Sequence, residues 1–130
     1  MDSEKLIELL EENGLSEVEV KSHNSKYVSI EFSYEYDYEE TSAARDYANE
    51  ESDFEEDSRE WTEDWYSVYL DDIVNDNVQE IIEEICEELD IEAEFKKIEE
   101  ESQIGDVYKG IIVFCYDSTE IDMESLLSEY

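Results

Sequence analysis

The 130-residue chain has no proline and only three glycines, so few positions force a turn or break an element. Regular helices and strands should therefore dominate. It has only two cysteines, Cys86 and Cys115, and both lie within apolar patterns. We predict that they are buried free thiols, although a disulfide remains possible.

Targeting signals are also scarce. The N-terminal stretch MDSEKLIELL is acidic and has no apolar signal core, and no stretch approaches the roughly 18 apolar residues of a membrane span. We therefore expect no signal peptide, no membrane association and a cytoplasmic location.

Basic residues are the scarcest of the charged ones: eight Lys or Arg face 42 Asp or Glu, which gives a net charge of −34. A folded chain of this length is about 35–40 Å across, and duplex DNA carries about 20 phosphate charges over that distance. The protein is thus at least as negative per unit length as DNA. Its field repels nucleic acid and anionic membranes and favours a strongly basic partner.

Signals of catalysis and of metal binding are weak. The single histidine, His23, lies in a predicted turn, and no cysteine pair has zinc-ligand spacing. There is no Gly-rich phosphate loop and no nucleophile elbow, and the segment LDDIVNDNVQE lacks the central glycine of an EF-hand loop. We predict a protein that is not an enzyme and has no cofactor and no specific metal site.

Helical periodicity predicts a helix over residues 3–13, with Asp2 or Ser3 as N-cap and Gly14 just after its end. It also predicts a helix over residues 75–89, capped by Asn75 or Asp76, and a last helix capped by Ser118 or Thr119. The buried stripe of the second helix is expected to contain Val78, Ile81, Ile82, Ile85, Cys86 and Leu89.

Alternation with a period of two predicts strands over residues 17–22, 27–38 and 91–98, with turns at 23–25 and 103–106. Residues 107–116 are apolar on both faces, as a central or covered strand would be. On the strand 27–38, one face is expected to hold Val28, Ile30, Phe32, Tyr34, Tyr36 and Tyr38, and the other Glu31, Glu35 and Asp37.

Two segments are harder to assign. Residues 40–58 suggest a short helix followed by an exposed acidic loop, together an acidic excursion from the sheet. Residues 60–70 are rich in Trp, Tyr and Val, which favours a strand, although the spacing of residues 61, 65, 68 and 69 would also suit a helix.

These elements predict an α+β fold in a single domain, residues 1–130. We expect an antiparallel sheet of about five strands with helices packed on one face. The order helix, strand, turn, strand occurs twice, which suggests an internal α-β-β repeat. The apolar set Ile111, Val113 and Cys115 could be covered by a helix, the simpler alternative, or by a second copy of the chain in a homodimer.

The carboxylates have a spacing similar to that of nucleic-acid phosphates. Outward side chains recur about every 6.6 Å on a strand, acids three or four residues apart on a helix lie about 5–6 Å apart, and phosphates of one DNA strand are roughly 6–7 Å apart. In charge and composition the chain resembles the DNA-mimic class of phage anti-defence proteins, the anti-CRISPR and antirestriction inhibitors. This resemblance implies a non-catalytic inhibitor that occupies the DNA-binding cleft of a bacterial defence nuclease in the host cytoplasm.

The expected partner-binding residues are the acids of the strand end and of the excursion, with two rings among them. They are Glu31, Glu35, Asp37, Glu39, Glu40, Asp46, Tyr47, Glu50, Glu51, Asp53, Phe54, Glu55, Glu56, Asp57, Glu60, Glu63 and Asp64. A secondary acidic face is expected on the helix 75–89, at Glu80, Glu83, Glu84, Glu87 and Glu88. Trp61 and Trp65 are expected in the core more than at the interface.

Three other functions would also explain the charge. An immunity or antitoxin protein would neutralise one basic nuclease toxin, and a sequestering partner would hold a basic protein without inhibiting an enzyme. A protein adapted to high salt would unfold at low salt, but here Glu outnumbers Asp by more than two to one. The target, the step that is blocked and the choice between monomer and homodimer stay open.

Overall fold

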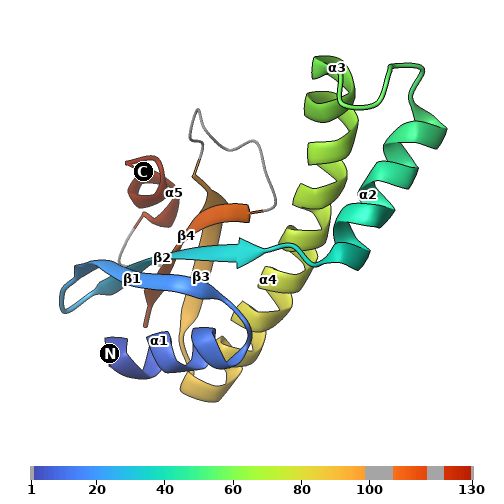
Figure 1. Ribbon diagram of the computed structural model, residues 1–130. Coiled ribbons are helices and arrows are strands. Elements are labelled where there is room, and N and C mark those ends of the chain that lie inside the picture. The colour runs from blue at the N-terminus through green and yellow to red at the C-terminus, as the bar shows by residue number, and fades with distance from the viewer. Residues whose placement is uncertain (1, 99–106, 117–121, 130) are drawn as a thin grey trace. The chain divides into compact units, whose positions relative to one another are not determined.

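The computed structural model describes residues 2–98, 107–116 and 122–129 (Figure 1). The fold is α+β, as predicted. Its elements are α1 (Ser3–Glu12), β1 (Ser16–His23), β2 (Tyr27–Glu35), α2 (Tyr38–Glu51), α3 (Arg59–Trp61), the π-helical turn η1 (Thr62–Tyr66), α4 (Ser67–Leu89), β3 (Glu92–Lys97), β4 (Val107–Cys115) and α5 (Met123–Leu127).

The chain forms two compact units. The sheet unit comprises residues Met1–Glu35 and Gln79–Tyr130, and the helical unit comprises Tyr36–Val78. The predicted acidic excursion at about 40–58 falls within the helical unit. Each unit is described separately below.

The sheet has four antiparallel strands in the order β1-β2-β4-β3, not five. The strands β2 and β4 pair at the centre, with Val28 opposite Phe114 and Ile30 opposite Ile112. Each half of the predicted repeat, α1-β1-β2 and α4-β3-β4, places its first strand at an edge and its second strand at the centre. The sheet order is the one that an α-β-β repeat implies.

The strand β4 is buried on both faces, as its sequence predicted. On one face Ile111, Val113 and Cys115 pack against Met123 and Leu127 of α5. The opposite face carries the fully buried Ile112 and Phe114, and α1 lies on the other side of the sheet from α5 (Figure 1). Helices therefore cover both faces rather than one, and the covering helix expected over Ile111, Val113 and Cys115 is α5.

The helix ends follow the chemistry of their capping residues. The Asp2 carboxylate accepts the N–H groups of Glu4 and Lys5 at the start of α1, and Gly14 has φ +94° just beyond its end, both as predicted. The last helix begins at Met123 with Asp122 as its N-cap. The predicted caps Ser118 and Thr119, and the predicted turn 103–106, lie outside the described residues.

The strand β2 ends at Glu35, three residues before the predicted end, because a capping box starts a helix there. The Asp37 carboxylate accepts the Glu40 N–H at 2.8 Å, and the Glu40 carboxylate accepts the Asp37 N–H at 3.0 Å. The prediction that Tyr36 and Tyr38 continue the buried face of the strand is therefore wrong. Tyr38 is 84% exposed as the first residue of α2.

Residues 60–70 are helical. The strand that their composition favoured is therefore wrong, and the alternative indicated by the spacing of residues 61, 65, 68 and 69 is correct. α3, η1 and α4 follow one another directly, and α4 passes through Asn75 and Asp76 without a break. The predicted cap at 75 or 76 is thus wrong, whereas the predicted helix 75–89 is confirmed. In the segment 40–58, the expected helix and loop are α2 and residues 52–58.

Gly110 is required by the core of the sheet. It lies opposite Phe32, and a Cβ atom at this position would be 2.6 Å from Cζ of Phe32 and 3.0 Å from the carbonyl oxygen of Lys96. Phe32 is fully buried and cannot move aside.

We predict that Gly110→Ala lowers the free energy of unfolding by about 1–3 kcal/mol, the usual cost of overpacking. Urea denaturation of the purified variant measures this change. Phe32→Leu shortens the ring that clashes, so the double variant Phe32→Leu/Gly110→Ala should lose less stability than the two single losses added together. Strictly additive losses would contradict the assigned contact.

Candidate protein-binding surface

The helical unit is a pair of helices around a small core. One cluster of this core consists of Ala44 and Ala48 of α2 with Trp61, Tyr66 and Leu70 from the following helical stretch, all buried. Small alanine side chains let α2 approach the rings closely. Figure 1 shows α2 beside the stretch that begins with α3. These packed helices carry the acidic side chains of the unit.

The π-helical turn η1 brings two rings of this core together. The Ser67 N–H donates to the carbonyl of Thr62, the i→i+5 bond that defines a π-turn. Residues five apart then lie one above the other, and the rings of Trp61 and Tyr66 stack with centroids 5.2 Å apart and planes 11° apart. In a regular α-helix residues five apart point in different directions.

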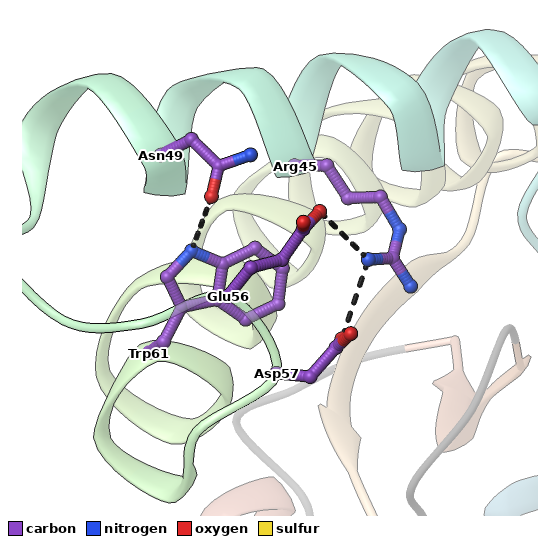
Figure 2. Close-up of polar contacts among 5 residues, drawn as sticks. All are labelled: Arg45, Asn49, Glu56, Asp57 and Trp61. Atoms are coloured by element: carbon purple, nitrogen blue, oxygen red, sulfur yellow. Dashed lines mark hydrogen bonds and ion pairs between the residues drawn. The ribbon is translucent and has the colours of Figure 1, made fainter.

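Arg45 of α2 holds this stack and the adjoining loop together (Figure 2). Its guanidinium lies 5.7 Å from the Trp61 ring centroid and 5.4 Å from that of Tyr66. It donates to Glu56 Oε1 at 3.2 Å and to Asp57 Oδ1 at 3.3 Å. One cation therefore joins α2, the ring stack and the loop 52–58.

Two further contacts fix the loop 52–58. The indole N–H of Trp61 donates to Asn49 Oδ1 at 3.0 Å (Figure 2), and Ser58 Oγ accepts the Trp61 N–H as the N-cap of α3. Asp57 has φ +66°, a left-handed conformation that Asp tolerates better than most residues. The predicted exposed acidic loop is therefore a loop tied to the helices on both sides.

The helical unit carries most of the predicted partner-binding residues and little neutralising charge. Residues 36–78 contain sixteen Asp or Glu and two arginines. Arg45 bonds Glu56 and Asp57, and Arg59 pairs with Glu63 at 3.4 Å. Predicted residues that are exposed here are Asp37, Glu39, Asp46, Tyr47, Glu50, Glu51, Asp53, Phe54, Glu55, Glu56, Asp57, Glu60, Glu63 and Asp64, while Glu40 is half-buried.

Four exposed acids follow the helical stretch α3, η1 and α4 of this unit. Glu60, Asp64, Asp72 and Asp76 recur at intervals of four residues, with Val68 at the remaining position, and all five are exposed. Within α4 the four-residue step from Asp72 to Asp76 rises about 6 Å along the helix axis, close to the roughly 6–7 Å between phosphates on a DNA strand. We call these four acids the acidic row. Its second half, Asp72 and Asp76, was not among the predicted residues.

The structure does not form the predicted row of carboxylates along β2. Glu31 is paired with Lys21 at 3.4 Å, and its neighbours on that face, Ser29 and Ser33, are buried. Glu35 is exposed at the end of the strand, and Asp37 is the N-cap of α2. From the sequence alternation, this face of the sheet was expected to be exposed to solvent. Other side chains cover it in the structure, so its polar residues do not form an exposed row.

The secondary acidic face is displayed as predicted. Glu80, Glu83, Glu84, Glu87 and Glu88 on the sheet-unit part of α4 are all exposed. On the same helix Val78, Ile82 and Ile85 are buried, which confirms the predicted stripe at these three positions, while Ile81, Cys86 and Leu89 are half-buried.

The rings predicted within the acidic segment divide between core and surface. Trp61 is 1% exposed and belongs to the core, as expected, while Trp65 is half-buried. Tyr47 is 38% exposed and packs against Trp65 and Tyr69. Phe54, in the loop 52–58, is 47% exposed.

The described residues include no cluster of side chains that could hold a metal ion. Across residues 2–98, 107–116 and 122–129, no three His, Cys, Asp or Glu side chains are grouped as metal ligands would be. His23 is exposed at the end of β1. Both cysteines are free thiols, Cys115 buried and Cys86 half-buried.

Comparison with protein-family models, curated proteins and solved structures gave no match. In the described ranges, no helix combines the length and the apolar composition needed to cross a bilayer.

We predict that Cys86 is a poor nucleophile. Burial, followed by smaller effects of Cys115, Glu92 and Glu83, raises the pKa of the Cys86 thiol to about 11. The thiol is therefore protonated at pH 8, and alkylation by iodoacetamide in a Cys115→Ala background should be slower than for free cysteine by about two orders of magnitude. The rate should rise about tenfold per pH unit towards pH 11, and a plateau near pH 8.5 would contradict this assignment.

We predict that Arg45→Gln lowers the free energy of unfolding by about 1 kcal/mol, since an exposed cation–π contact and two surface ion pairs are each worth a fraction of that. Backbone hydrogen exchange in residues 52–58 should become faster. Arg59→Gln is the matched control, because it removes the same charge from a side chain that is 82% exposed and makes one ion pair. Equal effects of the two variants would show that Arg45 acts only through its net charge.

Proposed function

We propose that this protein is a non-catalytic DNA mimic that acts in the bacterial cytoplasm. It occupies the nucleic-acid-binding cleft of a defence nuclease, either a CRISPR effector or a restriction enzyme, and competes there with DNA. The observation that carries the proposal is the acidic row, Glu60, Asp64, Asp72 and Asp76, which is exposed along the continuous helical stretch α3, η1 and α4.

The charge balance of the helical unit supports this proposal. Residues 36–78 contain sixteen acids and two arginines, and both arginines are engaged with carboxylates of the same unit, so negative charge is in large excess there. A cleft lined with Lys and Arg would supply the missing charges by charge-assisted hydrogen bonds. A surface with mixed charges, as in most soluble proteins, would not gain in this way.

Folded geometry adds to the argument from composition. A disordered acidic tail would lose conformational entropy when its charges were fixed in a cleft. Here the acids stand on packed helices, and the loop between them is held by Arg45 and the Trp61–Asn49 hydrogen bond. The carboxylates are therefore positioned before a partner arrives.

The proposal is tested by competition. Purified CRISPR effectors and restriction endonucleases are each incubated with a fluorescently labelled duplex, and the protein is added while anisotropy is recorded. For a true target the protein should displace the duplex, and excess unlabelled duplex should reverse the displacement. A nuclease that binds the protein and the duplex simultaneously would contradict mimicry and favour the immunity or sequestering alternatives.

We predict that Glu60→Gln, Asp64→Asn, Asp72→Asn and Asp76→Asn together weaken displacement at least about tenfold, mainly by slowing association. The matched control removes four exposed acids of the sheet unit, Glu8, Glu11, Glu12 and Glu94, by substitution with Gln. The two fourfold variants lose the same number of negative charges. The control should therefore change displacement less than about threefold if the acidic row determines binding. Equal losses would show that net charge, and not the acidic row, determines binding.

Charge reversal at Glu31, Glu35 and Asp37 would be a less informative test. Asp37 caps α2 and Glu31 is paired with Lys21, so their reversal would also disturb the fold. None of the contacts described above gives the residues of the acidic row a comparable structural role.

A further inference from the structure

An exposed ring cluster on the helical unit has no cation bound to it within that unit. It consists of Tyr47 on α2 with Trp65 and Tyr69 from the facing helical stretch, and we call it the ring cluster. The Tyr47 ring centroid lies 6.1 Å from that of Trp65 and 5.0 Å from that of Tyr69. Tyr47 is 38% exposed, and Trp65 and Tyr69 are half-buried.

Three carboxylates lie one helical turn beyond ring residues of the cluster. Glu50 and Glu51 follow Tyr47 by three and four residues on α2, which places them one turn further along the same side of the helix. Asp72 follows Tyr69 by three residues on α4 in the same way. All three carboxylates are exposed. Aromatic centres within polar rims are typical of interface hot spots.

The same unit shows what such a combination binds. At the other ring pair, Trp61 and Tyr66, the Arg45 guanidinium lies over both rings and donates to two carboxylates at the same time. Arginine suits this double role because its guanidinium is planar, stacks on rings and carries several donors. The ring cluster repeats the combination of rings and acids, but residues 36–78 contain no third arginine or lysine to fill it.

We infer that the ring cluster receives an arginine side chain of the partner. Its guanidinium stacks on Tyr47, Trp65 and Tyr69 and donates N–H groups to Glu50, Glu51 or Asp72. This inference rests on the proposed function, since it names the chemistry with which the basic cleft meets the helical unit. It adds a preference for arginine over lysine, which charge mimicry alone does not require, because phosphate-binding clefts use both.

The test uses two short probes of equal charge, hexa-arginine and hexa-lysine, at one fixed ionic strength. The protein has two tryptophans, so the two indole N–H signals in a proton–nitrogen NMR spectrum report on Trp61 and Trp65 separately. We expect hexa-arginine to shift the Trp65 signal more than the Trp61 signal. We also expect its dissociation constant, followed at Trp65, to be lower than that of hexa-lysine by about two- to fivefold per ring engaged.

Variants of Tyr47 separate stacking from charge. Tyr47→Leu should weaken hexa-arginine binding about two- to fivefold and hexa-lysine binding less, while Tyr47→Phe keeps the ring and should keep the preference. The control Tyr116→Leu removes a tyrosine that is 56% exposed in the sheet unit and should change neither. Circular dichroism confirms that each variant retains its helices.

Equal binding of the two peptides, or equal weakening of both by Tyr47→Leu, would overturn the inference. Neither outcome depends on a nuclease, so this failure is distinct from failure of the proposed function. If hexa-arginine is preferred but no nuclease releases its duplex, the ring cluster is an arginine site and the proposed DNA mimicry is wrong.

Discussion

Mutual repulsion among 42 carboxylates, with eight basic side chains to offset it, is the constraint that shapes this molecule. Most acids among the described residues therefore occupy exposed positions, and cohesion comes from apolar packing. In the sheet unit a strand buried on both faces, β4, supplies that packing. The helical unit has a much smaller core, and there one cation, Arg45, joins a ring pair, two acids and a loop.

Much of the sheet unit could be predicted from sequence because its signals are local. Period-two alternation gave β1, β2 and β3, a run of apolar residues gave β4, and capping residues marked both ends of α1. The errors arose where one local signal outweighed another. The capping box at Asp37 and Glu40 ended β2 despite continuing alternation, and helical packing of Trp61, Tyr66 and Leu70 overrode the β-propensity of residues 60–70.

The candidate surface could be predicted only in part. The sequence indicated which segment is richest in acids, since that depends on composition. It could not show that Glu31 pairs with Lys21, or that Ser29 and Ser33 beside it are buried, because both depend on how the strands pair. It also missed Asp72 and Asp76, which join the acidic row only once residues 67–89 are known to be helical.

The proposed function requires carboxylates that the fold holds in position. An acidic composition alone would not meet this requirement. The most direct test of the proposed DNA mimicry is a structure of the protein bound to a nuclease that releases DNA in the competition assay, compared with the same nuclease bound to DNA. The account predicts that Glu60, Asp64, Asp72 and Asp76 contact the Lys and Arg side chains that hold phosphates in the DNA complex. Contacts made only outside the DNA-binding cleft would contradict it.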